Sequence, residues 1–173
     1  MEWKDLIIQN FDISLDRLVS YLDGLTQEDL NWQPKPDCNS IGWITWHLIR
    51  VIDKGISISA NEEQLWIKAG WSSKFDRPAD PDDTGNRQTP EQAAAFKSPD
   101  KDTLIGYCRA AADNLRNWLN KLDSTDLDRE FDDEYSQMLP TVGSRVNVIV
   151  RDTQQHLGQI AYIRGLLQGH GWQ

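Results

Sequence analysis

The amino-acid sequence predicts an all-α protein, a four-helix bundle in which one connection between helices is long. Four stretches place apolar residues at three- and four-residue steps, which is the period of a helix that packs on one side. No run alternates apolar and polar residues for long enough to indicate a strand. The chain has 173 residues, of which 39% are hydrophobic, so we expect one domain over residues 1–173 with a substantial core.

The first helix is predicted over residues 2–24. Its inward face follows steps of three and four residues through Ile7, Phe11, Ser14, Leu18, Leu22 and Leu25. Gly24 interrupts this pattern, and residues 26–30 have the composition of a single capped turn. An extended connection with two prolines follows, after which Asn39 or Ser40 can cap the next helix.

The second helix is predicted over residues 41–60, with a further amphipathic piece at 62–70. Residues 72–99 hold four prolines, four aspartates and one glycine, so we expect no regular element there. A structureless connection of this length either counts against the assignment or marks a functional lid. It also allows the helices on either side of it to run parallel, as in bundles with a crossover.

The third and fourth helices are predicted over residues 101–122 and 142–168. The third carries an apolar stripe formed by Leu104, Cys108, Ala111, Leu115, Trp118 and Leu122. The fourth ends at Gly169, a residue type that favours helix termination. Between these helices, the acidic stretch 123–134 is most simply a solvated connection, and His170 is expected in an exposed tail.

Composition excludes several classes of function. The net charge is −9 and no basic patch is evident, so we expect no nucleic-acid partner. The N-terminus lacks the basic and apolar regions of a secretory signal, and charged side chains interrupt the longest apolar run, so we expect no membrane partner. Cys38 and Cys108 form neither a disulfide framework nor a metal motif, and a cytoplasmic location is the simplest expectation.

The chemically most informative residues lie on the fourth helix. Asp152 and His156 are four residues apart, so they share one helix face, one turn apart, with a stripe of apolar residues. A carboxylate and an imidazole on an inward face cost free energy unless something satisfies them. A divalent metal would satisfy both, and His47, in another apolar segment, is a third candidate ligand. Three ligands leave a coordination position open for water or substrate.

Other interpretations of the same residues stay open. His156 is also compatible with a core histidine bonded to a neighbour, or with a simple pair formed with Asp152. His47 is compatible with a polar spot on a packed helix, with Arg50 pointing outward. Gln159 is suited either to orient a metal ligand by a hydrogen bond or to contact another helix.

Several segments together resemble a known family. The chain resembles DinB-like proteins at residues 25–34 (LTQEDLNWQP), 39–43 (NSIGW), 46–48 (WHL) and 155–160 (QHLGQI). The order and spacing of these motifs extend the resemblance over nearly the whole chain. Residues 65–71 (LWIKAGW) and 83–85 (DTG) are in addition similar to a branch that contains thiol-dependent transferases using mycothiol or bacillithiol.

This resemblance implies a four-helix bundle with a long crossover, a divalent metal near one end, and a homodimer. Carried over by motif, the metal ligands are His47, Asp152 and His156. Many family members have a histidine at the position of Asp152, whereas the mycothiol-dependent isomerase branch has a glutamate. Aspartate is shorter than glutamate by one methylene, so the metal itself is not fixed by the motif. Imidazole ligands favour zinc or nickel.

Three functions are compatible with these observations. The first is a metal-dependent transferase that joins a small-molecule thiol to an electrophilic substrate, since a bound cation makes a thiol nucleophilic. The second is a hydrolase in which the same centre activates water. The third is a non-catalytic dimeric bundle in which the polar cluster is structural. The sequence singles out no catalytic residue besides the metal ligands and no binding site for an organic cofactor.

Overall fold

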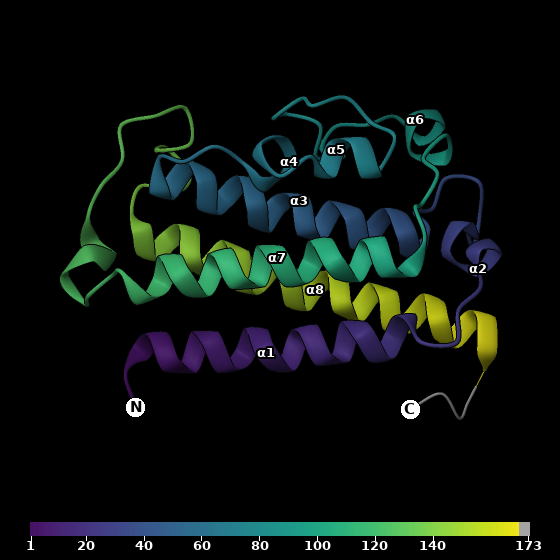
Figure 1. The fold of residues 1–173 in the computed structure, drawn as a ribbon, viewed down its shortest axis with the longest axis horizontal. Coiled ribbons are helices and arrows are strands. Elements are labelled where there is room, and N and C mark those ends of the chain that lie inside the picture. Colours follow the sequence, from purple (N-terminus) through teal and green to yellow (C-terminus); the bar gives the residue numbers. More distant parts are fainter. Residues whose placement is uncertain (170–173) are drawn as a thin grey trace.

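The computed structural model of the protein describes residues 1–169, and the prediction for His170 lies outside this range. Its framework is four long helices: α1 (Trp3–Leu22), α3 (Ile41–Ala60), α7 (Lys101–Asn120) and α8 (Val142–Gln168). Figure 1 shows that they lie side by side as a bundle. The all-α prediction is confirmed, and residues 1–169 contain no strand.

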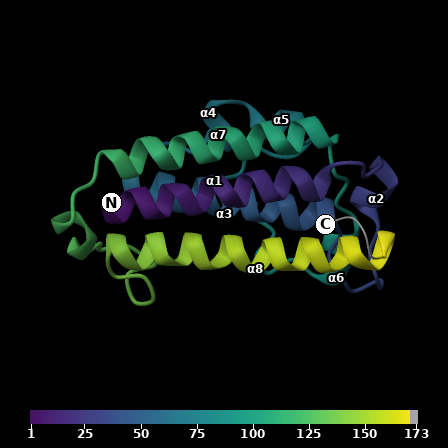
Figure 2. The same cartoon turned by 90° about the horizontal axis from the view of Figure 1, so that it is seen from below.

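Each long helix packs against two others. Helix α3 contacts α7 and α8, and α1 contacts the same two helices from the opposite side. Helices α1 and α8 run in one direction, while α3 and α7 run in the other (Figures 1 and 2). The consecutive long helices α3 and α7 are therefore parallel, because the connection between them crosses back along the bundle.

Local sequence signals explain where these helices begin and end. Of the two possible caps, Ser40 begins α3, since its side chain accepts a hydrogen bond from the backbone N–H of Trp43. Thr26 caps the short helix α2 (Gln27–Asn31) with a reciprocal capping box. Helix α8 ends at Gly169, whose φ of 68° suits glycine.

The crossover between α3 and α7 contains three short helices: α4 (Leu65–Lys68), α5 (Trp71–Lys74) and α6 (Pro90–Ala94). Only α4 remains of the amphipathic piece predicted at 62–70, because the rest of that segment turns. Most of the segment 72–99 is irregular, as predicted, although it contains α6 and most of α5. In Figure 1 the crossover covers the outer side of α3.

The alternative interpretation in which Arg50 points outward is wrong. Arg50 and Asp53 are both fully buried, because the crossover covers the face of α3 on which they lie. The Asp53 carboxylate accepts hydrogen bonds from the backbone N–H groups of Leu65 and Trp66, at 2.9 and 2.8 Å, and from the hydroxyl of Tyr107 at 2.7 Å. These bonds attach the start of the crossover to the bundle.

The connection from α7 to α8 begins with a short 3₁₀ helix (η1, Thr125–Asp128) and is largely exposed, as expected for its acidic composition. An isolated bridge pairs Glu130 with Thr141 and closes the loop of residues 131–140. No helix within residues 1–169 combines the length and the apolar composition needed to cross a bilayer.

Candidate metal centre

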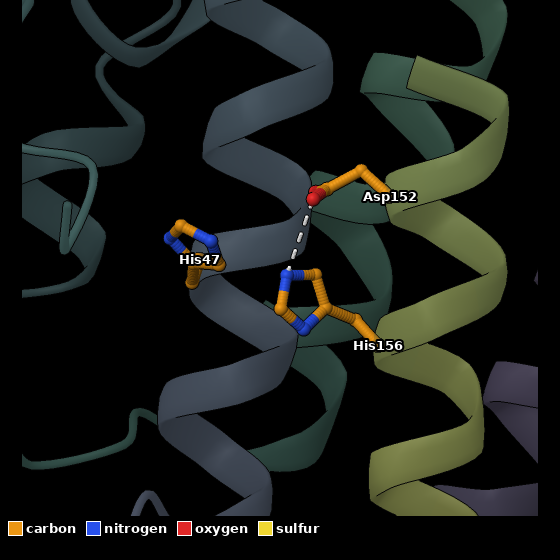
Figure 3. A group of neighbouring side chains, drawn as sticks. All are labelled: His47, Asp152 and His156. Carbon is orange, nitrogen blue, oxygen red and sulfur yellow. Dashed lines mark ion pairs between the residues drawn. The ribbon is translucent and has the colours of Figure 1, made fainter. Parts of the chain in front are cut away.

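His47, Asp152 and His156 lie together between α3 and α8 (Figure 3). Each offers one ligand atom, and these atoms are within 4.8 Å of one another. Asp152 and His156 face α3 from consecutive turns of α8, and His47 meets them because these helices pack directly on each other. The structure therefore brings together all three residues that the sequence analysis singled out.

The group lies at the inner side of the helices rather than on the surface. His47 and His156 are buried, with exposed fractions of 7% and 9%. The Asp152 side chain is 25% exposed, although its Oδ2 atom is buried. The indole of Trp43 stacks on the His47 ring with centroids 5.0 Å apart, and the two imidazoles meet edge to face at 4.9 Å.

A backbone carbonyl fixes the tautomer of His47. Its Nδ1 lies 2.5 Å from the carbonyl oxygen of Thr84, in the crossover. Because a carbonyl oxygen can only accept a hydrogen bond, Nδ1 carries the proton and donates it. The lone pair of a neutral His47 is therefore on Nε2, where it is available to a metal.

His156 is oriented in the same way from its own helix. Its Nδ1 is 2.7 Å from the side-chain oxygen of Gln159, so Gln159 orients this ring, which was one of its two predicted roles. The opposite nitrogen, Nε2, is 3.5 Å from Oδ1 of Asp152. With Nδ1 protonated, a neutral His156 would direct a lone pair at a carboxylate oxygen. A proton or a metal ion between the two atoms removes this repulsion.

The second carboxylate oxygen of Asp152 gives an independent test of the fit. Oδ2 is buried and has no hydrogen-bond partner in the protein, which is costly for a charged group. Ligand atoms bound about 2.0–2.2 Å from one zinc ion lie roughly 3–4 Å from one another. The observed spread of 4.8 Å exceeds this only slightly, so the donor set and its unpartnered oxygen fit a divalent cation after a small contraction.

The pKa values of the two histidines move in opposite directions. Burial lowers the pKa of His47, against the opposing effect of the hydrogen bond to Thr84. Burial also acts to lower the pKa of His156, but the hydrogen bonds to Asp152 and Gln159 outweigh it, and its pKa is raised. His47 is thus held neutral, while His156 retains a proton to higher pH.

A cavity of about 750 Å³ lies near the three residues, although none of them lines it. It lies in the groove between α3 and α8, with walls formed by the crossover and by the connection that precedes α8. Val51 follows His47 by four residues and Val148 precedes Asp152 by four, so the cavity begins about one helical turn from the cluster. Thr84, whose carbonyl holds His47, also lines it.

Sequence reasoning did not find the cavity or the role of Thr84. Both arise where the crossover packs against α3, and no local pattern in the sequence predicts this contact. The only signal for Thr84 was its place in the motif 83–85 of the resemblance. The tryptophans near the site do not line the cavity: Trp43 stacks on His47, and Trp46 and Trp66 belong to the core.

Some helical bundles carry potential metal ligands, histidine and carboxylate side chains, between facing helices. The protein has the architecture of this class. Residues 10–160 match the DinB superfamily, and the chain belongs to this family. It is also similar to a protein whose structure is described as the crystal structure of the conserved protein of locus from Enterococcus faecalis, with 28% identity, a TM-score of 0.87, and coverage of 98% of this chain and 99% of that chain. No curated protein matches the chain.

Proposed function

We propose that the protein is a metal-dependent transferase that joins a small-molecule thiol to an electrophilic substrate. His47, Asp152 and His156 would hold one divalent cation, zinc or nickel, since imidazole suits both. One observation carries the proposal. Both Nδ1 atoms are occupied by oxygen acceptors, which leaves two Nε2 atoms and a carboxylate for the same small volume.

Three protein ligands suit a reactive centre, because structural zinc sites usually have four. A cation held there would lower the pKa of a bound thiol and make the nucleophilic thiolate available at neutral pH. The residues of the chain keep the ligands in place: Thr84 and Gln159 hold the Nδ1 protons, and Trp43 stacks on the ring of His47.

The cavity that begins about one helical turn from the cluster is the place where we expect the two substrates to bind. Its volume of about 750 Å³ lies within the range of about 300–1,000 Å³ typical of small-molecule sites. Aliphatic side chains of α3 and α8 contribute to its lining, together with Lys54, Arg87 and Glu134. Such a lining suits a molecule that has both apolar and polar parts.

The choice of a thiol over water rests on the resemblance of residues 65–71 and 83–85, and of the acidic residue Asp152, to thiol-dependent transferases. Both cysteines are free, which is compatible with the cytoplasmic location that we propose. A hydrolase and a non-catalytic dimeric bundle are the alternatives, and both are outcomes of the following test.

The test is a turnover screen of zinc- and nickel-loaded protein against small electrophiles, with several low-molecular-weight thiols and without any. Turnover that requires a thiol supports the transferase. Equal rates with and without thiol identify a hydrolase. His156→Ala should abolish turnover and reduce the bound metal, whereas Gln155→Ala, an exposed neighbour on α8, should leave both unchanged. No turnover, with metal content unchanged in His156→Ala, would identify a structural cluster.

A further inference from the structure

The guanidinium of Arg50 holds the crossover segment of residues 80–83 by its backbone. Arg50 Nε donates to the carbonyl oxygen of Asp83 at 2.9 Å. Its Nη2 lies 3.2 Å from the carbonyl oxygen of Pro81 and 3.4 Å from that of Asp80. A fully buried arginine that donates to three carbonyls of one segment fixes the path of the chain at that point.

The other side of the same guanidinium is fixed within the bundle. Arg50 Nη1 lies 3.2 Å from the hydroxyl of Tyr107 and 3.4 Å from Oδ2 of Asp53. The group also lies over the ring of Trp66, 4.6 Å from its centroid. Arg50 therefore links α3 and α7 to the crossover with little freedom to reorient.

The residue that follows this segment, Thr84, is the one whose carbonyl accepts the Nδ1 proton of His47. The carboxylate of Asp83 is held by both Nε and Nη2 of Arg77, at 2.6 and 2.7 Å. After Thr84, Gly85 packs so closely on Trp43 that a Cβ atom would lie 2.6 Å from the indole. The Thr84 carbonyl is thus held in position from both sides.

We propose that Arg50 is a positioning residue for His47. It lies one turn after His47 on α3, and it holds residues 80–83 so that the Thr84 carbonyl keeps the proton of His47 on Nδ1 and leaves Nε2 free. This inference rests on the metal site of the proposed function and is independent of the choice of thiol. Its test needs neither bound metal nor turnover.

The experiment measures the tautomer of each histidine in metal-free protein labelled with ¹⁵N-histidine. In Arg50→Lys the charge beside Asp53 remains, but a lysine ammonium cannot reproduce the planar fork that donates to the carbonyls. We expect His47 to change from the Nδ1–H tautomer to a mixture. The nitrogen of His156 that carries the proton should stay the same, because Gln159 holds this ring from within α8. In Gln159→Ala we expect the opposite result: the tautomer of His156 should change, and that of His47 should not.

Zinc affinity provides a second measurement. We expect Arg50→Lys to weaken zinc binding about 10- to 100-fold, the usual effect of losing a group that orients a ligand. Lys54→Met is the matched control: Lys54 is also on α3 and pairs with the exposed carboxylate of Asp82 in the same segment, but it donates to none of the carbonyls. This variant should keep both the tautomer and the zinc affinity.

A folded Arg50→Lys protein with an unchanged His47 tautomer would refute the proposal. If that variant does not fold, the double variant Arg50→Met with Asp53→Asn takes its place, because it removes both charges and leaves no unpaired ion buried. The tautomers of His47 and His156 are then compared in this double variant in the same way. If the natural protein binds neither zinc nor nickel, the proposed function fails, while the tautomer comparison still tests the role of Arg50.

Discussion

Oδ1 of Asp152 lies 3.5 Å from Nε2 of His156, one turn further along α8. The far nitrogen of this imidazole donates to Gln159, so the near nitrogen meets the carboxylate with its lone pair unless a cation lies between them. At this pair a proton and the proposed metal ion would compete for one position. The first two predictions follow from that competition.

Asp152→Asn should weaken zinc binding at least about tenfold, because the amide keeps the shape of the side chain but removes the negative charge that faces the cation. Isothermal titration calorimetry on metal-free protein measures this change. Asp128→Asn, in an exposed part of η1, is the control and should bind zinc as the natural protein does. Equal affinities of the two variants would exclude Asp152 as a ligand.

Zinc affinity should decrease on acidification, first through His156. A histidine must be neutral to ligate, and the raised pKa of His156 means that its proton competes with zinc from a higher pH than an ordinary histidine would allow. The lowered pKa of His47 delays its own competition to more acidic conditions. Affinities measured over a pH range from about 8 to about 5 should show one proton displaced first and a second at lower pH. A constant affinity over this range would contradict the ligand assignment.

The two thiols should differ sharply in reactivity. Cys108 is buried in α7, and burial raises the pKa of its thiol to about 12, so almost no thiolate forms near neutral pH. Cys38 is half-buried in the connection before α3. A thiol-specific chromogenic reagent should therefore label one cysteine in the folded protein and two after denaturation. Cys38→Ser should leave no thiol that reacts before unfolding, and rapid labelling of that variant would show that Cys108 is accessible.

Two glycine substitutions should change stability in opposite directions. Gly85 has φ of 87° and lies against Trp43, so Gly85→Ala should lower the free energy of unfolding by about 1–3 kcal/mol. Gly158 is helical, and no neighbouring side chain lies within 4 Å of the position that a Cβ atom would take, so Gly158→Ala should raise it by about 0.5–1 kcal/mol. Urea denaturation of both variants measures these changes. A shift of the same sign in both would contradict the prediction.

We predict a homodimer, as the family resemblance implies. Tyr162 and Leu166 are 70% and 50% exposed, and their spacing on α8 gives them one shared face, which makes it the surface to test. Light scattering at micromolar concentration should give twice the mass of one chain, and Tyr162→Glu with Leu166→Glu should give monomers. Met138→Glu, at an exposed loop position, should stay dimeric. A monomeric natural protein would remove the prediction.

The helices and the three clustered side chains could be predicted because their signals are local. The predicted bounds 41–60 and 142–168 match α3 and α8, since apolar periodicity and capping residues act within a few positions. The spacing of Asp152 and His156 on one helix face is likewise a property of adjacent turns. His47 could be included in the predicted ligand set because it lies in an apolar segment and in a motif that the chain shares with the family.

The environment of these side chains could not be predicted, because it comes from distant parts of the chain. From the sequence alone, Arg50 is expected at the surface of α3, because nothing in its own segment shows that the crossover covers it. Its partners in the crossover are the backbone carbonyls of residues 80, 81 and 83. Any residue type supplies a backbone carbonyl, so Thr84 leaves no compositional signal. The cavity depends in the same way on two connections that carry no periodicity.

The three proposed ligands are separated by more than half of the given sequence, because one is on α3 and two are on α8. During synthesis, α8 is made after α1, α3 and α7, so a nascent chain that stops before α8 has only His47 of the three. Because side chains that are distant in sequence meet only in the folded protein, metal uptake by the proposed site would be coupled to folding. Binding of zinc with full affinity would then report that α8 has docked on α3, and successive truncations from the end of α8 would lose metal in one step.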